Sequence, residues 1–173
     1  MLTPEIEAWL STLPNDKVVT ILPFDPTAEE KYQKVKQQIQ NVLGEGISVV
    51  HRGSTSLGIS GQSEIDIYVP SEPSEFDALH KKLVSVLGKP HSILPLQRIR
   101  WSLFVDGKRA DVFLSNVRHS DWIEGVAFEC ICKTTPHVLR AYEKLKQESN
   151  GWTVQDFYRK KAQFIDAVLS GKI

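Results

Sequence analysis

The chain has 173 residues, of which 41% are hydrophobic and 24% charged, a composition typical of a globular domain. Basic and acidic residues number 21 each, so the zero net charge provides no overall field to attract DNA or an anionic membrane. The N-terminus has neither the basic nor the apolar region of a signal peptide, and no apolar run approaches the roughly 18 residues of a spanning helix. With Cys130 and Cys132 read as reduced thiols, we expect a single cytoplasmic domain over residues 1–173.

The first part of the chain predicts two helices and one strand. Residues 4–13 fit a short helix and residues 18–22 an apolar strand. Pro26 sits at the start of a second helix, which runs to about residue 43 and is ended by Gly44 and Gly46.

Strands dominate the middle of the sequence. We expect them at residues 47–51, 65–69, 99–105 and 110–114, with a helix over residues 76–87. Gly53-Ser54-Thr55 forms a turn that opens a short helical segment. Asp106-Gly107 is typical of the turn in a β-hairpin.

The last part predicts only helices, over residues 122–131, 137–147 and 154–169. The whole pattern indicates an α+β fold. A small mixed β-sheet with flanking helices occupies about residues 22–116, and a helical C-terminal part occupies about residues 119–173.

Three acidic residues in predicted strands suggest a metal site. Glu64 and Asp66 are two residues apart, so they lie on the same face of a strand, where two carboxylates repel and need a counter-charge. Mg²⁺ takes oxygen ligands and leaves room for substrate phosphates. Asp111 stands between apolar residues, where an unpaired carboxylate is costly. If its strand neighbours that of Asp66, the three acids form the cluster that phosphoryl transfer with two metal ions requires.

Gly53 and Ser54 fit the other half of such a site. A glycine lets the backbone approach phosphates closely, and Ser54 can donate from a helix N-terminus. Each feature also has a structural interpretation. Glu64 and Asp66 fit an exposed edge strand, Asp111 could lie in solvent beside the hairpin turn, and Ser54 could be a helix N-cap.

The order of Gly-Ser, then Glu-x-Asp, then a lone later Asp resembles the polymerase-β-type nucleotidyltransferase superfamily. From about residue 22 to residue 169 the chain is similar to the GrpB-like family, also called UPF0157, at His51, residues 53–55 and residues 65–67. The resemblance continues in the C-terminal helices at Phe128, Pro136, Tyr142, Leu145, Lys146, Tyr158, Lys160, Phe164 and Ile165. It implies a small mixed β-sheet of nucleotidyltransferase type.

Two departures from the GrpB-like pattern bear on the site. The family usually has Pro-Gly and then Lys-Pro between the Gly-Ser-Thr segment and the Asp, whereas residues 57–63 of this chain have neither pair. The family commonly has an apolar residue where this chain has Glu64, so the chain is closer to the three-acid pattern of the superfamily.

The motif and the resemblance together imply a nucleotidyltransferase dependent on Mg²⁺ or Mn²⁺. It would transfer a nucleoside monophosphate from a nucleoside triphosphate, expected to be ATP, to an unknown acceptor. Neutral charge and small size favour a small molecule or a protein over a long nucleic acid. Glu64, Asp66 and Asp111 are expected to be both metal ligands and catalytic residues. The residues expected to bind the nucleotide are Gly53, Ser54, Thr55, Arg52, Arg100, Arg109 and Lys146.

A second hypothesis is a non-catalytic module that binds a nucleotide or a partner on the same scaffold. GrpB-like domains also occur fused to dephospho-CoA kinase, which suggests a role accessory to coenzyme A metabolism. The arginines at positions 98, 100 and 109 have two interpretations. They could form a cationic wall that binds phosphates or an acidic acceptor, or they could lie on a solvated strand face. His51 and Arg52 alternate in direction, and the sequence leaves open which of them faces the site.

Overall fold

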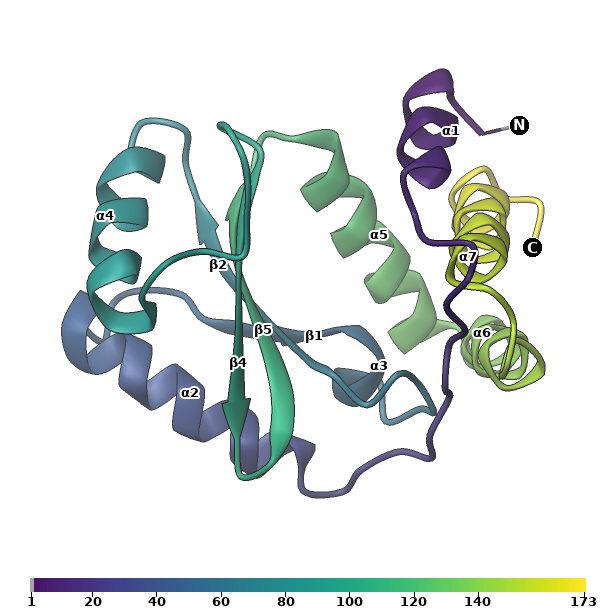
Figure 1. The fold of residues 1–173 in the computed structure, drawn as a ribbon, viewed down its shortest axis with the longest axis horizontal. Coiled ribbons are helices and arrows are strands. Elements are labelled where there is room, and N and C mark those ends of the chain that lie inside the picture. Colours follow the sequence, from purple (N-terminus) through teal and green to yellow (C-terminus); the bar gives the residue numbers. More distant parts are fainter. Residues whose placement is uncertain (1) are drawn as a thin grey trace.

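The computed structural model describes residues 2–173 and consists of one mixed sheet with helices on both faces (Figure 1). The strands are β1 (Val50–Arg52), β2 (Ile65–Ser71), β3 (Ser92–Leu94), β4 (Arg98–Val105) and β5 (Lys108–Asn116), in the order β1-β2-β5-β4-β3. The helices are α1 (Pro4–Ser11), α2 (Ala28–Leu43), α3 (Gly53–Ser56), α4 (Phe76–Leu87), α5 (Ser120–Thr134), α6 (Pro136–Glu148) and α7 (Val154–Leu169). The predicted α+β class is confirmed.

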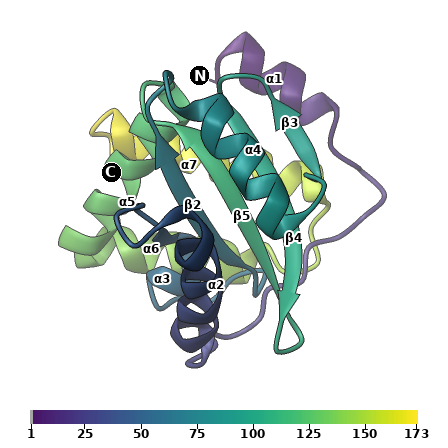
Figure 2. The same cartoon turned by 90° about the vertical axis from the view of Figure 1, so that its left-hand side faces the viewer.

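One face of the sheet packs on α2 and α4 (Figure 2). Side chains alternate along β2, and Ile65, Ile67 and Val69 are fully buried on this face. Each such side chain contributes about 1.5–3 kcal/mol to folding. Their partners include apolar residues of both helices and of β4 and β5, namely Tyr32, Val35, Ile39, Phe76, Leu79, Leu83, Ile99, Trp101, Val112 and Leu114.

The opposite face carries the polar residues, and the strand register brings the acids together. β2 and β5 are parallel neighbours, with Asp66 directly opposite Asp111. Paired residues on adjacent strands project to the same side of a sheet, so the two carboxylates share one face. The strand of Asp111 therefore neighbours the strand of Asp66, which is the condition that the predicted three-acid cluster required.

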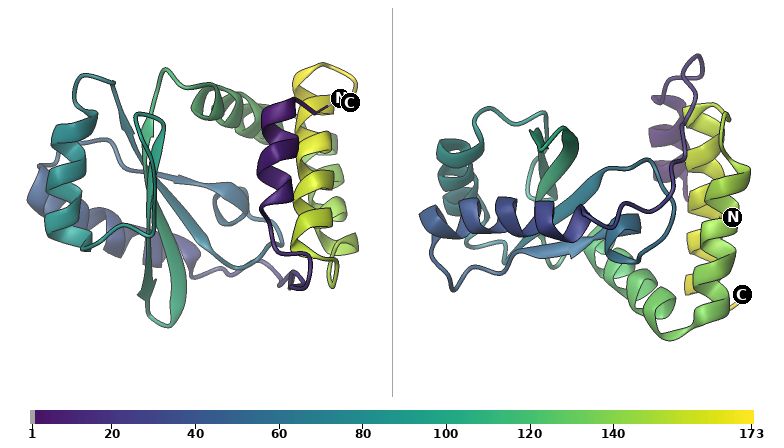
Figure 3. Two further views of the ribbon diagram at one scale, coloured as in Figure 1. Left: turned by 45° about the horizontal axis from the view of Figure 1, so that its top comes forward. Right: turned by 90° about the horizontal axis from the view of Figure 1, so that it is seen from below.

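The C-terminal helices stand beside this polar face and have a small core of their own, centred on Phe128, Tyr142 and Val168. α1 lies along α7 (Figure 3), where Gln155 Nε2 donates to the carbonyl of Leu10 at 3.0 Å. Among residues 2–173, no helix has both the length and the apolar composition needed to cross a lipid bilayer.

The predicted strand at residues 18–22 is wrong. This segment runs past the C-terminal helices and makes two isolated bridges, Val18 with Thr153 and Leu22 with Gly61. An apolar run needs a partner along its length to form a strand, and here the partner changes after a few residues. The expected strand at residues 47–51 is also displaced, because its pairing with β2 begins only at Val50. The short exposed strand β3 was not predicted.

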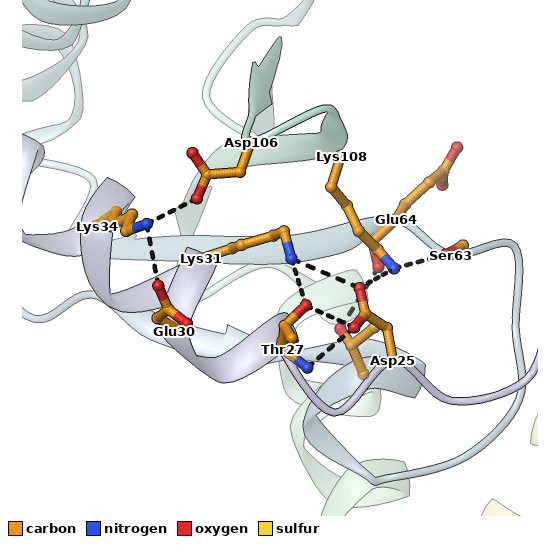
Figure 4. A network of polar contacts seen from close by, with 10 residues as sticks. Asp25, Thr27, Glu30, Lys31, Lys34, Ser63, Glu64, Asp106 and Lys108 are labelled. Atoms are coloured by element: carbon orange, nitrogen blue, oxygen red, sulfur yellow. Dashed lines mark hydrogen bonds and ion pairs between the residues drawn. The ribbon is translucent and has the colours of Figure 1, made fainter.

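A network of charged residues fixes the loop that leads into β2 (Figure 4). Lys108 Nζ donates to Asp25 Oδ2 at 2.5 Å and to Ser63 Oγ at 2.6 Å. Ser63 has a left-handed backbone, with φ of 67°, immediately before Glu64. The hydrogen bond from Lys108 lowers the pKa of Asp25 well below its usual range. The network therefore holds Glu64 in place beside β2.

Lys108→Met is expected to destabilise the fold by about 1–3 kcal/mol, since it removes charge-assisted hydrogen bonds from a largely buried ammonium. Urea unfolding measures this cost. The matched control is Lys34→Met, because Lys34 pairs with Asp106 while both side chains are about half exposed. We expect that control to cost less than about 1 kcal/mol. Equal costs for the two variants would show that the network does not stabilise the loop.

Candidate active site

Three carboxylates meet on the polar face of the sheet. Glu64 directly precedes β2, Asp66 lies within it, and Asp111 lies in the neighbouring strand β5. One oxygen from each side chain lies within 4.8 Å of those of the other two. Asp111 is only 2% exposed. Three converging hard oxygen donors fit Mg²⁺ or Mn²⁺, which bind carboxylates and keep positions for phosphate oxygens.

Arg109 supplies the counter-charge to two of these acids. Its guanidinium donates to both oxygens of Asp111, at 3.1 and 2.9 Å, and lies 2.9 Å from Glu64. Arg100 is more distant, with Nη1 at 3.9 Å from Asp111 Oδ2. A divalent ion bound to the acids therefore has to compete with Arg109 for Glu64 and Asp111.

The electrostatics of Asp66 differ from those of its neighbours. Burial raises the pKa of Asp66 to about 7; nearby Lys161 opposes this rise, while Glu64 and Asp111 add to it. Burial also raises the pKa of Glu64. Such a carboxyl is costly to ionise without a cation beside it. A bound divalent cation would therefore favour the ionised form of Asp66.

The backbone of Gly53 closes one side of the cluster. Gly53 has φ of 76°, and a Cβ placed on it would lie 2.3 Å from Asp66 Oδ2. The next residue, Ser54, accepts a short hydrogen bond from Lys146 Nζ of α6. Gly61 approaches the same serine, since a Cβ at that position would lie 2.7 Å from Ser54 Oγ. Gly53 therefore forms part of the rim of the acidic cluster, and Ser54 follows it directly in the chain.

Lys146 and α7 bring cations to this rim from the C-terminal helices. Lys146 is 4% exposed, and its ammonium lies 4.6 Å from the ring centre of Tyr142. Burial lowers its pKa to about 7, and nearby Lys161 of α7 lowers it further. A buried lysine without a full carboxylate partner is suited to receive an anion such as a phosphate.

Two site residues on α7 and one on the loop were not predicted. Lys161 acts electrostatically on Glu64, Asp66 and Lys146, and Tyr158 forms a 3.4 Å hydrogen bond with Gln62. The family resemblance pointed to Lys160, which is exposed on the outer side of α7. Helical spacing from Tyr158 would have selected Lys161, three residues later.

The side-chain hydrogen bonds of Arg52 and Thr55 go to groups other than the three carboxylates, although Arg52 stands opposite Asp66 in the strand register. The Arg52 guanidinium lies between Tyr68 and Trp122, 4.9 Å from each ring centre, and its Nε donates to Glu129 of α5 at 2.7 Å. Thr55 forms a 2.9 Å hydrogen bond with His51. His51 in turn stacks on Tyr32 of α2 and so lies on the helix-covered face, whereas Arg52, opposite Asp66, lies on the polar face. This answers the alternation that the sequence left open.

Gly53→Ala is expected to cost roughly 1–3 kcal/mol more than Gly58→Ala, because only the first pushes a methyl group against Asp66. Gly58 is a matched control, since it also has a left-handed backbone, with φ of 70°, but a Cβ there meets nothing within 4 Å. Urea unfolding of both variants isolates the clash from the backbone strain. Equal destabilisation would mean that Asp66 does not pack against Gly53.

The metal-free protein is expected to be least stable near pH 7. The pKa of Asp66 rises from 3.8 to about 7 on folding, so its contribution to stability is present at low pH and lost as the pH rises toward 7. The pKa of Lys146 falls from 10.5 to about 7, so its contribution increases as the pH rises above 7. Melting temperatures in EDTA test this. In a plot of melting temperature against pH, Asp66→Asn should flatten the slope below pH 7, and Lys146→Met should flatten the slope above it. Plots that both variants leave unchanged would contradict the prediction.

Comparison with known proteins shows which family this chain resembles. The GrpB protein family model matches residues 18–170. A UPF0157 protein of Vibrio cholerae is 26% identical over 148 residues, which cover 84% of this chain and 78% of that protein. The crystal structure of conserved protein GrpB from Enterococcus faecalis gives a TM-score of 0.58 at 19% identity, over 74% of this chain and 81% of that chain.

A cytoplasmic RNA terminal U-transferase structure gives a TM-score of 0.39 at 14% identity, over 84% of this chain and 47% of that chain. The likeness to the Enterococcus faecalis protein concerns the fold. The family match covers the sheet, the acidic cluster and the three C-terminal helices.

Proposed function

The chain belongs to the GrpB family, and from the geometry of its acidic cluster we propose that it is a metal-dependent nucleotidyltransferase. It transfers a nucleoside monophosphate from a nucleoside triphosphate, ATP in the first instance, to a small-molecule or protein acceptor. The observation that carries the proposal is the convergence of Glu64, Asp66 and Asp111 within 4.8 Å of one another. The Gly53-Ser54 turn and buried Lys146 at its rim complete a site for phosphates.

The residues of the site divide into two groups. Glu64, Asp66 and Asp111 would hold Mg²⁺ or Mn²⁺, which would supply the positive charge that lowers the pKa of an acceptor hydroxyl and offsets the charge of the triphosphate. The backbone of Gly53, the hydroxyl of Ser54 and the ammonium of Lys146 bind the β- and γ-phosphates.

In the reaction, Asp111 accepts the proton of the acceptor hydroxyl. The acceptor oxygen bonds to the α-phosphorus, the bond from that phosphorus to the bridging oxygen breaks, and pyrophosphate leaves. Arg109 and Arg100, which lie beside the acids, would offer their guanidinium groups to the phosphate oxygens.

The test is transfer of label from α-³²P ATP in the presence of Mg²⁺ or Mn²⁺, with pyrophosphate release measured in parallel. We expect wild-type protein to release pyrophosphate and Asp66→Asn to lose this activity while its melting temperature in EDTA at neutral pH is equal to or higher than that of wild type, because the variant removes a buried carboxyl that is costly to ionise. Transfer that survives in Asp66→Asn would overturn the proposal.

The contact of Arg109 with two of the acids supports a second candidate, a module that binds nucleotides without catalysis. A guanidinium already balances Glu64 and Asp111, so the fold does not require a metal ion for electrostatic reasons. In that case ATP should raise the melting temperature without any metal-dependent release of pyrophosphate.

A further inference from the structure

A small cavity, separate from the acidic cluster, lies on the polar face of the sheet, where α5 covers the ends of β2 and β5. Its volume is about 60 Å³, and its lining includes Tyr68, Arg98, Ser115, His119, Asp121 and Trp122. A cavity of this size holds roughly four water molecules. It can therefore take a small oxyanion, and it is too small for a nucleotide base.

Two polar groups of this cavity have no hydrogen-bond or ion-pair partner among residues 2–173. Ser115 is 4% exposed, and its Oγ forms no hydrogen bond. Arg98, directly opposite Ser115 on β4, forms no ion pair within the described residues, and its guanidinium lies 5.5 Å from the ring centre of Phe113. Buried hydroxyls are almost always paired, so an unpaired one beside a free guanidinium indicates a ligand that accepts hydrogen bonds.

The other charged groups of the lining have partners within residues 2–173. Arg52 is paired with Glu129. Asp121 accepts a 2.5 Å hydrogen bond from Gln97 and lies 3.7 Å from the ring nitrogen of His119, and its side chain is about half exposed to solvent. Arg98 has no carboxylate partner, which favours an anion beside its guanidinium.

The cavity and the acidic cluster share one face of one strand. Ser115 follows Asp111 by four residues on β5, a separation of about 13 Å. Between them lies the stacked pair of Tyr68 and Phe113, with ring centres 4.7 Å apart. A molecule of that length could place an anionic group at Arg98 and a hydroxyl at the acids.

We propose that this cavity binds the oxyanion, a phosphate or a carboxylate, of an anionic acceptor substrate. Arg98 and the hydroxyl of Ser115 donate to its oxygens, while its nucleophilic hydroxyl reaches Asp111. The assignment of the ligand as an acceptor rests on the proposed nucleotidyl transfer. The assignment of the cavity as an oxyanion site rests only on Arg98 and Ser115.

The test is a titration of the metal-free protein with inorganic phosphate, and separately with acetate, followed by the backbone amide signals in ¹⁵N NMR spectra. We expect saturable shifts at Ser115, Asn116 and Gly125, and the ion that binds more tightly identifies the group. Arg98→Met should weaken binding by roughly tenfold or more, and Arg140→Met on the exposed side of α6 should leave it unchanged.

Ser115→Ala is a second variant, chosen because it should fold as well as wild type even if Arg98→Met does not. It should weaken binding several-fold while leaving the melting temperature equal or higher, because it removes a buried hydroxyl that has no partner. Shifts confined to Gly53 and Ser54, or equal affinity in Arg98→Met, would overturn the proposal.

Asp66→Asn separates the two proposals. It should lose nucleotidyl transfer and keep phosphate binding at Ser115, whereas loss of both would place the anion at the acidic cluster and contradict this inference. If wild-type protein transfers no label but still binds phosphate through Arg98, the enzyme assignment fails and the oxyanion site remains.

Discussion

Asp111→Asn is expected to lower the rate of nucleotidyl transfer by roughly 10²–10³-fold, the loss seen when one preorganised electrostatic contact to a transition state is removed. The asparagine keeps the shape of the side chain but can neither balance a divalent ion nor accept a proton. Asp111 is also almost fully buried, on the strand between β2 and β4. The measurement is kcat/KM for the nucleoside triphosphate at saturating Mg²⁺.

The control for that variant is Asp106→Asn. Asp106 lies in the hairpin turn between β4 and β5 and is about half exposed. It forms an ion pair with Lys34 on the surface, and Lys31 lies near enough to act on its charge. Its replacement changes the net charge by the same amount and should leave kcat/KM within about twofold of wild type. Equal activity of Asp111→Asn and Asp106→Asn would exclude Asp111 from the reaction.

Arg52→Met is expected to destabilise the fold by about 3–5 kcal/mol, the usual cost of leaving one charge of a buried ion pair without its partner. Both Arg52 and Glu129 have side chains that are 10% exposed, and the pair joins β1 to α5. Burial would raise the pKa of Glu129, but hydrogen bonds from Arg52, Lys133 and Ser56 outweigh it and lower that pKa. Urea unfolding near pH 7 measures the effect.

A double variant shows whether the unpaired charge is the cause. Combining Arg52→Met with Glu129→Gln should recover part of the lost stability, because no buried carboxylate is then left alone. The surface control is Arg118→Met, whose partner Glu72 is about half exposed. It should cost less than about 1 kcal/mol. A cost of that size for Arg52→Met would mean that the pair does not anchor α5.

The sequence predicted best those features that depend on local periodicity. The helices over residues 76–87 and 154–169 match the structure because their apolar residues repeat at helical spacing. The hairpin turn was found because Asp106 and Gly107 both adopt a left-handed backbone, as such a turn requires. The GrpB resemblance is confirmed, since its signature combines a turn with two strands whose residues each follow a simple pattern.

The contacts that position the candidate site residues depend on tertiary packing and could not be predicted. Lys146 was expected to bind the nucleotide, but no local pattern says that a lysine on α6 contacts Ser54, 92 residues earlier in the sequence. The role of Arg109 as counter-charge depends on the parallel pairing of β2 with β5, which brings Arg109 within 2.9 Å of Glu64. Arg52 was assigned to the nucleotide because it precedes Gly53, but two aromatic rings and Glu129 hold its side chain against α5.

Binding of Mn²⁺ tests most directly whether Glu64, Asp66 and Asp111 form a metal site. Free Mn²⁺ can be followed by its EPR signal during titration of the protein in the presence of a non-hydrolysable ATP analogue. We expect saturable binding by wild type and by Asp106→Asn, and affinity at least about tenfold weaker in Asp66→Asn. Equal Mn²⁺ affinity in Asp66→Asn and wild type, or no binding by wild type, would contradict a catalytic metal site at these carboxylates.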